Sequence, residues 1–290
     1  MPNVAIVTDT THYVPREILA AKDIREVSLY VNDGERQQRE GDMADFGAFY
    51  ERLRSAAELP TTSQPSIGDF LEVYEPLAAE GRDIVSIHIA GGISGTVESA
   101  RQAAEQLMER FPGRRVEVID SATACGGIGL VALAAAGAAE AGGDIDDVAG
   151  RAREASAAMK IWFAVDTLEF LRRGGRIGAA QAWLGGALKI KPILTVEHEI
   201  TPIERVRTSG RAFERMVDYL RARHADGADG WVVQHIQAPG QARSLAERGR
   251  EIFSSEPMWV SEIGPVIGTH VGPGLLGVGG LPRSLLRSEL

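Results

Sequence analysis

The first half of the chain alternates short apolar runs with longer amphipathic segments, and this alternation is the strongest constraint on its fold. Apolar and β-branched runs predict four strands, at Val4–Val7, Glu26–Val31, Asp83–Ala90 and Arg115–Asp120. Helical spacing predicts helices between and after them, at Pro15–Ala21, Asp45–Ala57, Ser66–Glu80, Ser94–Phe111 and Ser121–Ala141. Because strands that alternate with helices pair in parallel, we expect a parallel sheet flanked by helices, with a ligand beyond the carboxyl ends of its strands.

The second half has a different pattern, from which we expect a second, smaller α/β domain. Apolar runs predict strands at Ile161–Val165, Ile193–Val196, Trp231–Ile236 and Met258–Ile263. Helical spacing predicts helices at Asp144–Met159, Thr167–Leu171, Ala179–Leu184, Arg211–Ala225 and Gln241–Phe253. We place the domain boundary near residue 160, which gives an N-terminal domain over residues 1–160 and a C-terminal domain over residues 161–290.

Composition excludes several classes of protein. A net charge of −9 argues against a nucleic-acid binder, and the single cysteine, Cys125, excludes a disulfide framework or a cysteine-based metal cluster. The six histidines have no metal-site spacing, so we expect neither a metal nor a cofactor. The uncharged stretch Ser121–Ala139 has the length of a membrane span, but it is mostly alanine and glycine. We interpret it as a helix packed under a sheet, and we expect a cytoplasmic protein without a spanning segment.

Two loops rich in hydroxyl groups precede predicted helices. The first loop is Thr61–Ser66 and the second is Gly91–Thr96. We expect each loop to follow the end of a strand, and therefore expect both on the same side of the parallel sheet. One interpretation is helix capping, by Ser66 with Asp69 and by Ser94 or Thr96. The other is an anion site, in which hydroxyl groups and free helix-end N–H groups converge.

Other motifs are incomplete or have structural interpretations. The segment around Ser94 lacks the glycine that a nucleophile elbow needs two residues later, where Thr96 stands, and no P-loop is present. Asp9 follows a strand, which favours an Asx turn or a helix cap. His270 lies in a glycine-rich segment, where a structural and a functional role are equally well supported. Arg173 and Arg207 lie in basic turns that fit either solvated surface or contact with an acidic partner.

Six motifs, in order, resemble the DegV family of bacterial fatty-acid-binding proteins. They run from about residue 4 to residue 280: Thr-Asp-Thr at 8–10, Thr-Thr-Ser-Gln-Pro-Ser at 61–66, Ile-Ser-Gly-Thr at 93–96, Asp-Thr-Leu-Glu-Phe-Leu-Arg-Arg-Gly-Gly-Arg-Ile at 166–177, Lys-Pro-Ile-Leu at 191–194 and Gly-Pro-Val-Ile-Gly-Thr-His-Val-Gly-Pro-Gly at 264–274. Two features depart from the family pattern. Val97 stands where an aromatic residue is frequent, and the tail after Gly280 carries no motif.

The resemblance implies a two-domain α/β fold that buries one fatty acid between its domains. It implies that Thr62 and Ser94 hold the carboxylate, that His270 lies near it, and that Ser63, Gly95 and Thr96 support the loops. It also implies a partner, an ATP-dependent fatty acid kinase that converts the bound acid into an acyl phosphate for phospholipid metabolism. We expect Arg173 and Arg207 to flank the kinase-docking face, and any membrane contact to be transient.

The chemistry of a fatty acid fits these residues. A buried carboxylate must have its oxygens hydrogen-bonded, and we expect neutral donors here, because an arginine clamp would block a carboxylate that must react. The leading interpretation is therefore a lipid carrier that is not itself an enzyme. The alternatives are a hydrolase that uses Ser94, a phosphotransfer enzyme that uses the same helix ends, and a regulatory protein that binds a polar small molecule.

Overall fold

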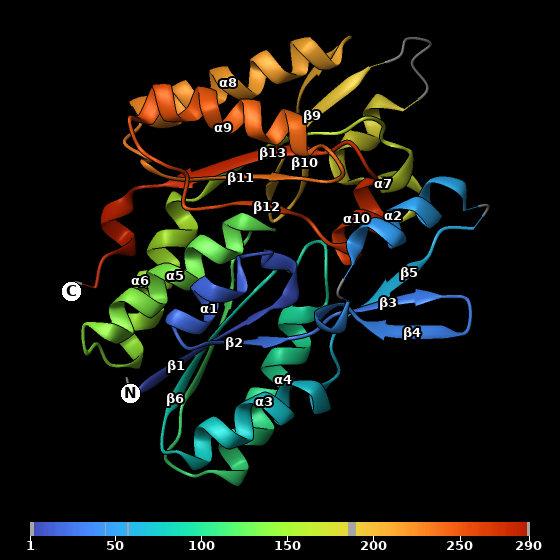
Figure 1. Cartoon of the computed structure of the whole chain (residues 1–290). Helices are drawn as coiled ribbons and strands as arrows, with labels where there is room; N and C mark the ends of the chain where they lie inside the picture. Colours follow the sequence, from blue (N-terminus) through green and yellow to red (C-terminus); the bar gives the residue numbers. More distant parts are fainter. Residues whose placement is uncertain (1–2, 44, 57, 185–189, 289–290) are drawn as a thin grey trace.

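The computed structural model describes residues 3–43, 45–56, 58–184 and 190–288, and two large sheets lie one above the other (Figure 1). The first sheet has four parallel strands in the order β2-β1-β6-β7. These strands are β1 (Val4–Asp9), β2 (Ile24–Val27), β6 (Asp83–His88) and β7 (Val116–Asp120). The parallel pairing predicted from the alternating pattern is confirmed.

Helices cover both faces of the first sheet. On one face lie α3 (Ile67–Ala79) and α4 (Thr96–Arg110), and on the other lie α5 (Gly126–Glu140) and α6 (Ile145–Ala158). A short helix, α1 (Arg16–Ala21), connects β1 to β2. The predicted capping box is present at the start of α3, where the side chains of Ser66 and Asp69 bond each other's backbone N–H groups.

Helix α5 lies between the two sheets, and this position explains its unusual sequence. Its residues from Gly126 to Ala139 are all buried. A side chain at Gly126 would lie 2.9 Å from atoms of Val232 and Gln234 in the second sheet, so small residues allow this close packing. The uncharged stretch is thus a buried helix, as predicted, and in the described part of the chain no helix has the length and hydropathy needed to cross a membrane.

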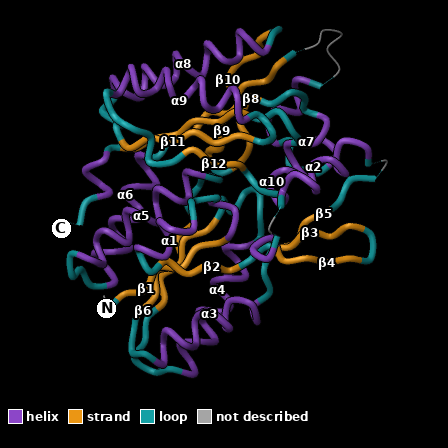
Figure 2. The backbone as a smooth tube through the Cα atoms, viewed as in Figure 1, coloured by secondary structure: helices purple, strands orange, loops and turns teal. Residues whose placement is uncertain are grey.

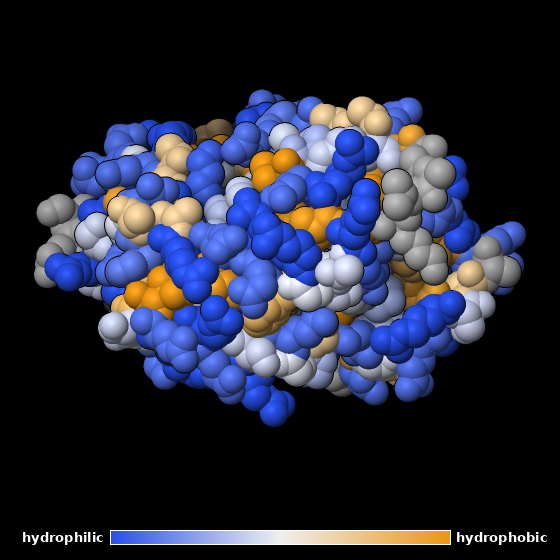
Figure 3. Space-filling view, turned by 90° about the horizontal axis from the view of Figure 1, so that it is seen from above, coloured by the Kyte–Doolittle hydropathy of each residue, from blue (hydrophilic) through white to orange (hydrophobic). Residues whose placement is uncertain are grey.

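The second sheet has six strands in the order β10-β9-β8-β13-β11-β12 and is mainly antiparallel. It lies above the first sheet in the view of Figure 2. The strands are β8 (Lys160–Ala164), β9 (Lys191–Glu197), β10 (Glu199–Val206), β11 (Gly230–His235), β12 (Val260–Glu262) and β13 (Leu276–Leu281). Two helices, α8 (Ser209–Ala225) and α9 (Pro239–Phe253), cover its outer face. Viewed from that side, the surface is mostly hydrophilic, with small separate apolar areas (Figure 3).

A small antiparallel sheet, in the order β4-β3-β5, corrects two expectations. Its strands are β3 (Tyr30–Asp33), β4 (Arg36–Arg39) and β5 (Thr61–Ser63). The predicted strand Glu26–Val31 is divided between β2 and β3, because the backbone of Leu29 bonds Thr10 and Glu40 instead of a neighbouring strand. Residues 61–63 form a strand of this sheet, so the expectation that both hydroxyl-rich loops leave one parallel sheet is wrong.

Three short helices lie where the two large sheets meet the small one (Figure 1): α2 (Phe46–Ser55), α7 (Glu169–Arg173) and α10 (Pro265–Val271). Short 3-10 helices occupy Thr10–His12, Glu40–Asp42, Gly178–Trp183 and Arg283–Leu286. The largest hydrophobic cluster contains residues of both halves, from Val4 to Leu281. The two large sheets thus share one core, and the domain boundary between residues 160 and 161 stays a prediction.

Candidate functional site

A cavity of about 360 Å³ lies between the two large sheets and is lined mainly by apolar side chains. Its size is within the range of about 300–1,000 Å³ that is typical of small-molecule sites. The apolar lining comes from both halves of the chain and includes Ile89, Ala124, Phe163, Val196, Val232 and Val271. The polar side chains include Thr62, Ser63, Gln64, Ser94, Arg176 and His270. An apolar space with a small polar group of side chains suits a ligand that is mostly hydrocarbon.

The side chains of Thr62 and His270 are hydrogen-bonded to each other in the wall of the cavity, although the two residues are 208 positions apart in the sequence. The Oγ1 atom of Thr62, on β5, lies 2.7 Å from Nε2 of His270, on α10. Nδ1 of His270 is buried and has no partner among the described residues. A buried unpaired N–H costs more than an unpaired lone pair, so we assign the ring proton to Nε2, which donates to Thr62. The hydroxyl of Thr62 is then free to donate its own hydrogen to a ligand.

The imidazole of His270 is held in its neutral form. Burial, with a smaller contribution from the nearby charge of Arg176, lowers the pKa of His270 to about 4. The close packing of α7 contributes to this burial, since a Cβ atom at Gly174 would overlap Nδ1 of His270. At neutral pH the site therefore offers hydrogen-bond donors from Thr62 and Ser94 without a charge on the histidine.

Ser94 lies in the loop between β6 and α4, and its Oγ atom is 2.8 Å from Oγ1 of Thr96. Helix α4 begins after Gly95 without a side-chain cap, so the expectation that Ser94 or Thr96 caps it is wrong. A Cβ atom at Gly95 would overlap the side chain of Gln64, which in turn donates to Ser99 on α4. Gln64 thus holds the segment after β5 against the start of α4, which brings Thr62 and Ser94 to one cavity.

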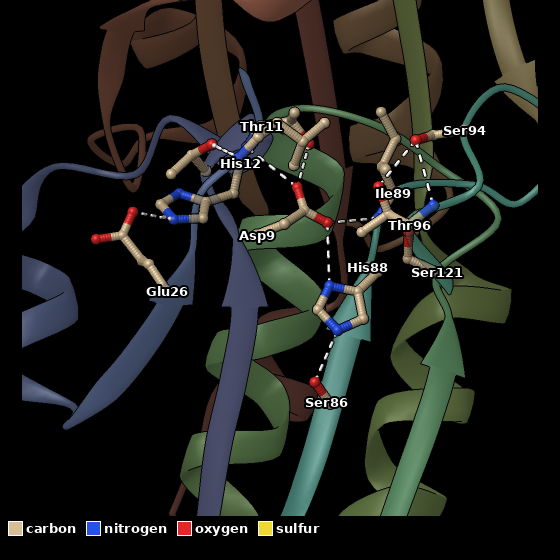
Figure 4. A network of polar contacts seen from close by, with 12 residues as sticks. Asp9, Thr11, His12, Glu26, Ser86, His88, Ile89, Ser94, Thr96 and Ser121 are labelled. Atoms are coloured by element: carbon tan, nitrogen blue, oxygen red, sulfur yellow. Dashed lines mark hydrogen bonds and ion pairs between the residues drawn. The ribbon is translucent and has the colours of Figure 1, made fainter. Parts of the chain in front are cut away.

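A chain of buried hydrogen bonds supports the end of β6, from which the Ser94 loop departs (Figure 4). Oδ2 of Asp9 accepts from the backbone N–H of Ile89 at 2.9 Å and from Nδ1 of His88 at 3.1 Å. On the far side of the ring, Nε2 of His88 lies 2.7 Å from Oγ of Ser86. Asp9 also caps the turn Thr10–His12, which confirms the interpretation of Asp9 as a cap. Its bond to His88 was not predicted from the sequence, although Asp9 and His88 are the last residues of the adjacent strands β1 and β6.

The order Asp9, His88, Ser86 is that of a catalytic triad, but its surroundings are those of a structural network. Ser86 lies within β6 with no exposed surface, and its hydroxyl receives a further hydrogen bond from Tyr74. Ser94, which does line the cavity, has Thr96 as its hydrogen-bond partner and contacts no histidine or carboxylate base in the described hydrogen bonds. A nucleophile needs such a base, so the geometry does not favour the alternative of a Ser94 hydrolase.

A second buried group holds the opposite end of α10. Oε1 of Glu40 accepts from the backbone N–H of Val266 at 2.7 Å and from the Tyr13 hydroxyl at 2.9 Å. Its other oxygen is buried and has no partner in the described part of the chain. Burial raises the pKa of Glu40 to about 7. Glu40, which no sequence motif marks, therefore holds the start of the helix that carries His270.

The arginines are distributed differently from the expectation. Arg173, on α7, and Arg207, after β10, are exposed and do not line the cavity. Arg176 does line it, so a charged donor is present beside the neutral ones. That neutral donors hold the carboxylate stays a prediction. The departure at Val97 does not affect the cavity, because this side chain is buried in α4 and is not part of the lining.

The fold and the cavity define a two-sheet α/β protein with an apolar cavity between its two large sheets. The family model described as "Uncharacterised protein, DegV family" matches residues 3–283. A DegV domain-containing protein of Streptomyces coelicolor is 40% identical over 279 residues, which are 95% of this chain and 97% of the relative. Protein DegV of Bacillus subtilis is 36% identical over 282 residues, which are 95% and 98% of the two chains. The chain belongs to the DegV family.

Solved structures of relatives have the same fold. The structure of DegV from Bacillus subtilis, described as a fatty acid binding protein, has a TM-score of 0.87 at 35% identity and covers 97% of this chain and 100% of its own. A DegV family protein from Thermus thermophilus, described by its fatty acid binding, has a TM-score of 0.85 at 34% identity with the same coverage. The predicted fold class and the resemblance to this family are confirmed.

Proposed function

We propose that this chain binds a long-chain fatty acid, with the hydrocarbon in the cavity between the sheets and the carboxylate beside Thr62, Ser94 and His270. The observation that carries the proposal is the apolar cavity with hydroxyl donors among its lining residues. Ser63, Gly95 and Thr96 would support the carboxylate loops. The fatty acids bound by the Bacillus subtilis and Thermus thermophilus relatives support this ligand class.

Native mass spectrometry of freshly purified protein tests the proposal directly. The expected result is a co-purified mass that matches a long-chain carboxylic acid and that disappears after delipidation. Re-addition of palmitic acid to the delipidated protein should restore a one-to-one complex. A protein that purifies empty and does not bind palmitic acid after delipidation would contradict the proposal.

We expect Thr62→Ala and Ser94→Ala each to weaken fatty acid binding by about 1–3 kcal/mol, because each removes a hydrogen bond to a charged group. Titration of delipidated protein with palmitic acid measures the effect. Ser55→Ala, which removes an exposed hydroxyl from α2, is the matched control and should leave the affinity unchanged. Wild-type affinity in both cavity variants would show that these hydroxyls do not hold the carboxylate.

We also propose that the bound acid is presented to a separate ATP-dependent kinase, which forms the acyl phosphate. A second, polar cavity adjoins the first and shares Ser94 and Arg176 with it, which supports access to the carboxylate from outside. The exposed guanidinium groups of Arg173 and Arg207 would attract an acidic surface of the kinase. The phosphoryl transfer would then be carried out by the partner and not by this chain.

The double variant Arg173→Ala with Arg207→Ala is expected to keep fatty acid binding and to lose most kinase-dependent acyl phosphate formation. The reason is that surface charges speed the association of this chain with the kinase, and salt screens that attraction. Without the two arginines, the remaining phosphorylation should therefore depend less on salt concentration. Arg221→Ala with Arg243→Ala removes two exposed arginines from the outer helices α8 and α9 and serves as the control. If the first pair retains wild-type phosphorylation, the docking face lies elsewhere.

A further inference from the structure

The central strand of the second sheet has no side chain on part of its inner face. The side chains of Leu276 and Val278 on strand β13 belong to the outer hydrophobic cluster. Gly277 and Gly279 lie on the opposite face of the strand and line the cavity, whose lining also includes Val278. Successive residues of a strand point to opposite faces, so Gly277 and Gly279, two positions apart, lie on the same face of β13 and form part of the cavity wall. Neither has a positive φ, so backbone conformation does not require glycine at these positions.

The neighbouring strands bear side chains on either side of this bare backbone. Gly277 pairs with Phe163 of β8 on one side and with Gln234 of β11 on the other. All three residues line the cavity. Adjacent strands are about 4.8 Å apart, so Phe163 and Gln234 start roughly 10 Å from each other across Gly277. This strip is wide enough for one hydrocarbon chain.

The two glycines differ in how closely neighbouring side chains approach them. A Cβ atom at Gly279 would lie 2.7 Å from both Ile161 and Met159, so the packing of the protein itself requires glycine there. At Gly277 the nearest atoms would be Cβ of Phe163 at 3.4 Å and Cδ2 of Leu275 at 3.6 Å, which are ordinary contacts. The packing around Gly277 therefore leaves room for a Cβ atom at this position.

Glycine within a strand lowers stability and frequently marks a place where a ligand approaches the backbone closely. We propose that Gly277 is a specificity-determining residue, over whose bare backbone the acyl chain passes, so that a side chain here limits the length of the acid that binds. This inference rests on the proposed binding of a fatty acid. It adds the position that decides which chain lengths the cavity accepts.

The test compares Gly277→Ala and Gly277→Val with the wild type in titrations of delipidated protein with saturated acids from octanoic to stearic. Acids too short to reach Gly277 should bind within about twofold of the wild type. Acids that extend past it should lose about tenfold in affinity in the alanine variant, equivalent to roughly two buried methylenes, and more in the valine variant. The preferred chain length should become shorter as the side chain becomes larger.

Gly150→Ala is the matched control, because a Cβ atom at this position of α6 would meet nothing within 4 Å. Thermal unfolding of each delipidated variant confirms that it folds. An unchanged length profile in both Gly277 variants, or an equal loss for all acids, would overturn the inference while the wild type still binds fatty acids. If the wild type binds none of the acids, the proposed function fails first, and the inference fails with it.

Discussion

The affinity of this chain for saturated fatty acids is expected to rise with every added methylene until the cavity is full, and then to rise no further. Each buried methylene contributes about 0.8 kcal/mol, which is roughly a fourfold change in the dissociation constant. From octanoic to palmitic acid, eight methylenes correspond to roughly 6 kcal/mol before the cost of ordering the chain. Titration of delipidated protein by calorimetry measures the whole series.

Two controls separate the contributions of the tail and the carboxylate. Acetate and butyrate carry the same carboxylate with little or no hydrocarbon. Their affinity should be too low for the site to be saturated at concentrations that can be reached. Methyl palmitate keeps the hydrocarbon and loses the charge, so its affinity should fall by about 1–3 kcal/mol for each of the hydrogen bonds that Thr62 and Ser94 donate to the carboxylate. If butyrate binds as tightly as palmitic acid, the cavity is a site for a small polar anion.

The first sheet could be predicted from the sequence because its local and long-range signals agree. The runs at Val4–Val7, Asp83–Ala90 and Arg115–Asp120 correspond to strands β1, β6 and β7. The helices between them have regular apolar spacing, and a capping box precedes α3. The second sheet could not be predicted as completely. Strand β13 was missed because its glycines remove the apolar side chains by which a strand is recognised, although it lies in the middle of the sheet.

Residues of the candidate site could be predicted where they belong to a local sequence motif. They could not be predicted where their role depends on a contact with a residue distant in the sequence. The hydroxyl groups of Thr62 and Ser94 were found because they cluster before helices, and the structure brings both to one cavity with His270. Their roles toward a carboxylate stay a prediction. Glu40 was not found, because its significance comes from its contact with α10, more than two hundred residues later in the chain.

The two buried titratable groups at the ends of α10 are expected to give the stability of the protein opposite dependences on pH. The pKa of Glu40 is raised by burial from 4.5 to about 7. Its contribution to stability is therefore fully present below about pH 4.5 and is lost as the pH rises through 7. The pKa of His270 is lowered by burial from 6.5 to about 4. Its contribution is fully present above about pH 6.5 and is lost as the pH falls through 4.

Over about pH 4.5–6.5 these two contributions change in opposite directions and nearly cancel in the wild type. Each single variant should reveal the pH dependence of stability that the remaining group contributes. Relative to the wild type, Glu40→Gln should gain stability as the pH rises, and His270→Gln should gain stability as the pH falls. Each change should approach roughly 3 kcal/mol over the full range of its group and should be about 1–2 kcal/mol between pH 5 and 6.5.

Urea unfolding of delipidated protein at several pH values measures these differences, with the linear extrapolation applied to each variant. Differences from the wild type remove the contributions of the other carboxylates, provided that the sites act independently. Glu35→Gln removes the same charge from an exposed turn beside β3 and is the matched control. If the differences for Glu40→Gln and His270→Gln do not change with pH, neither group titrates differently in the folded and unfolded chains. Opposite slopes would instead demonstrate that α10 is held by a protonated carboxyl group at its start and bears a neutral imidazole near its end.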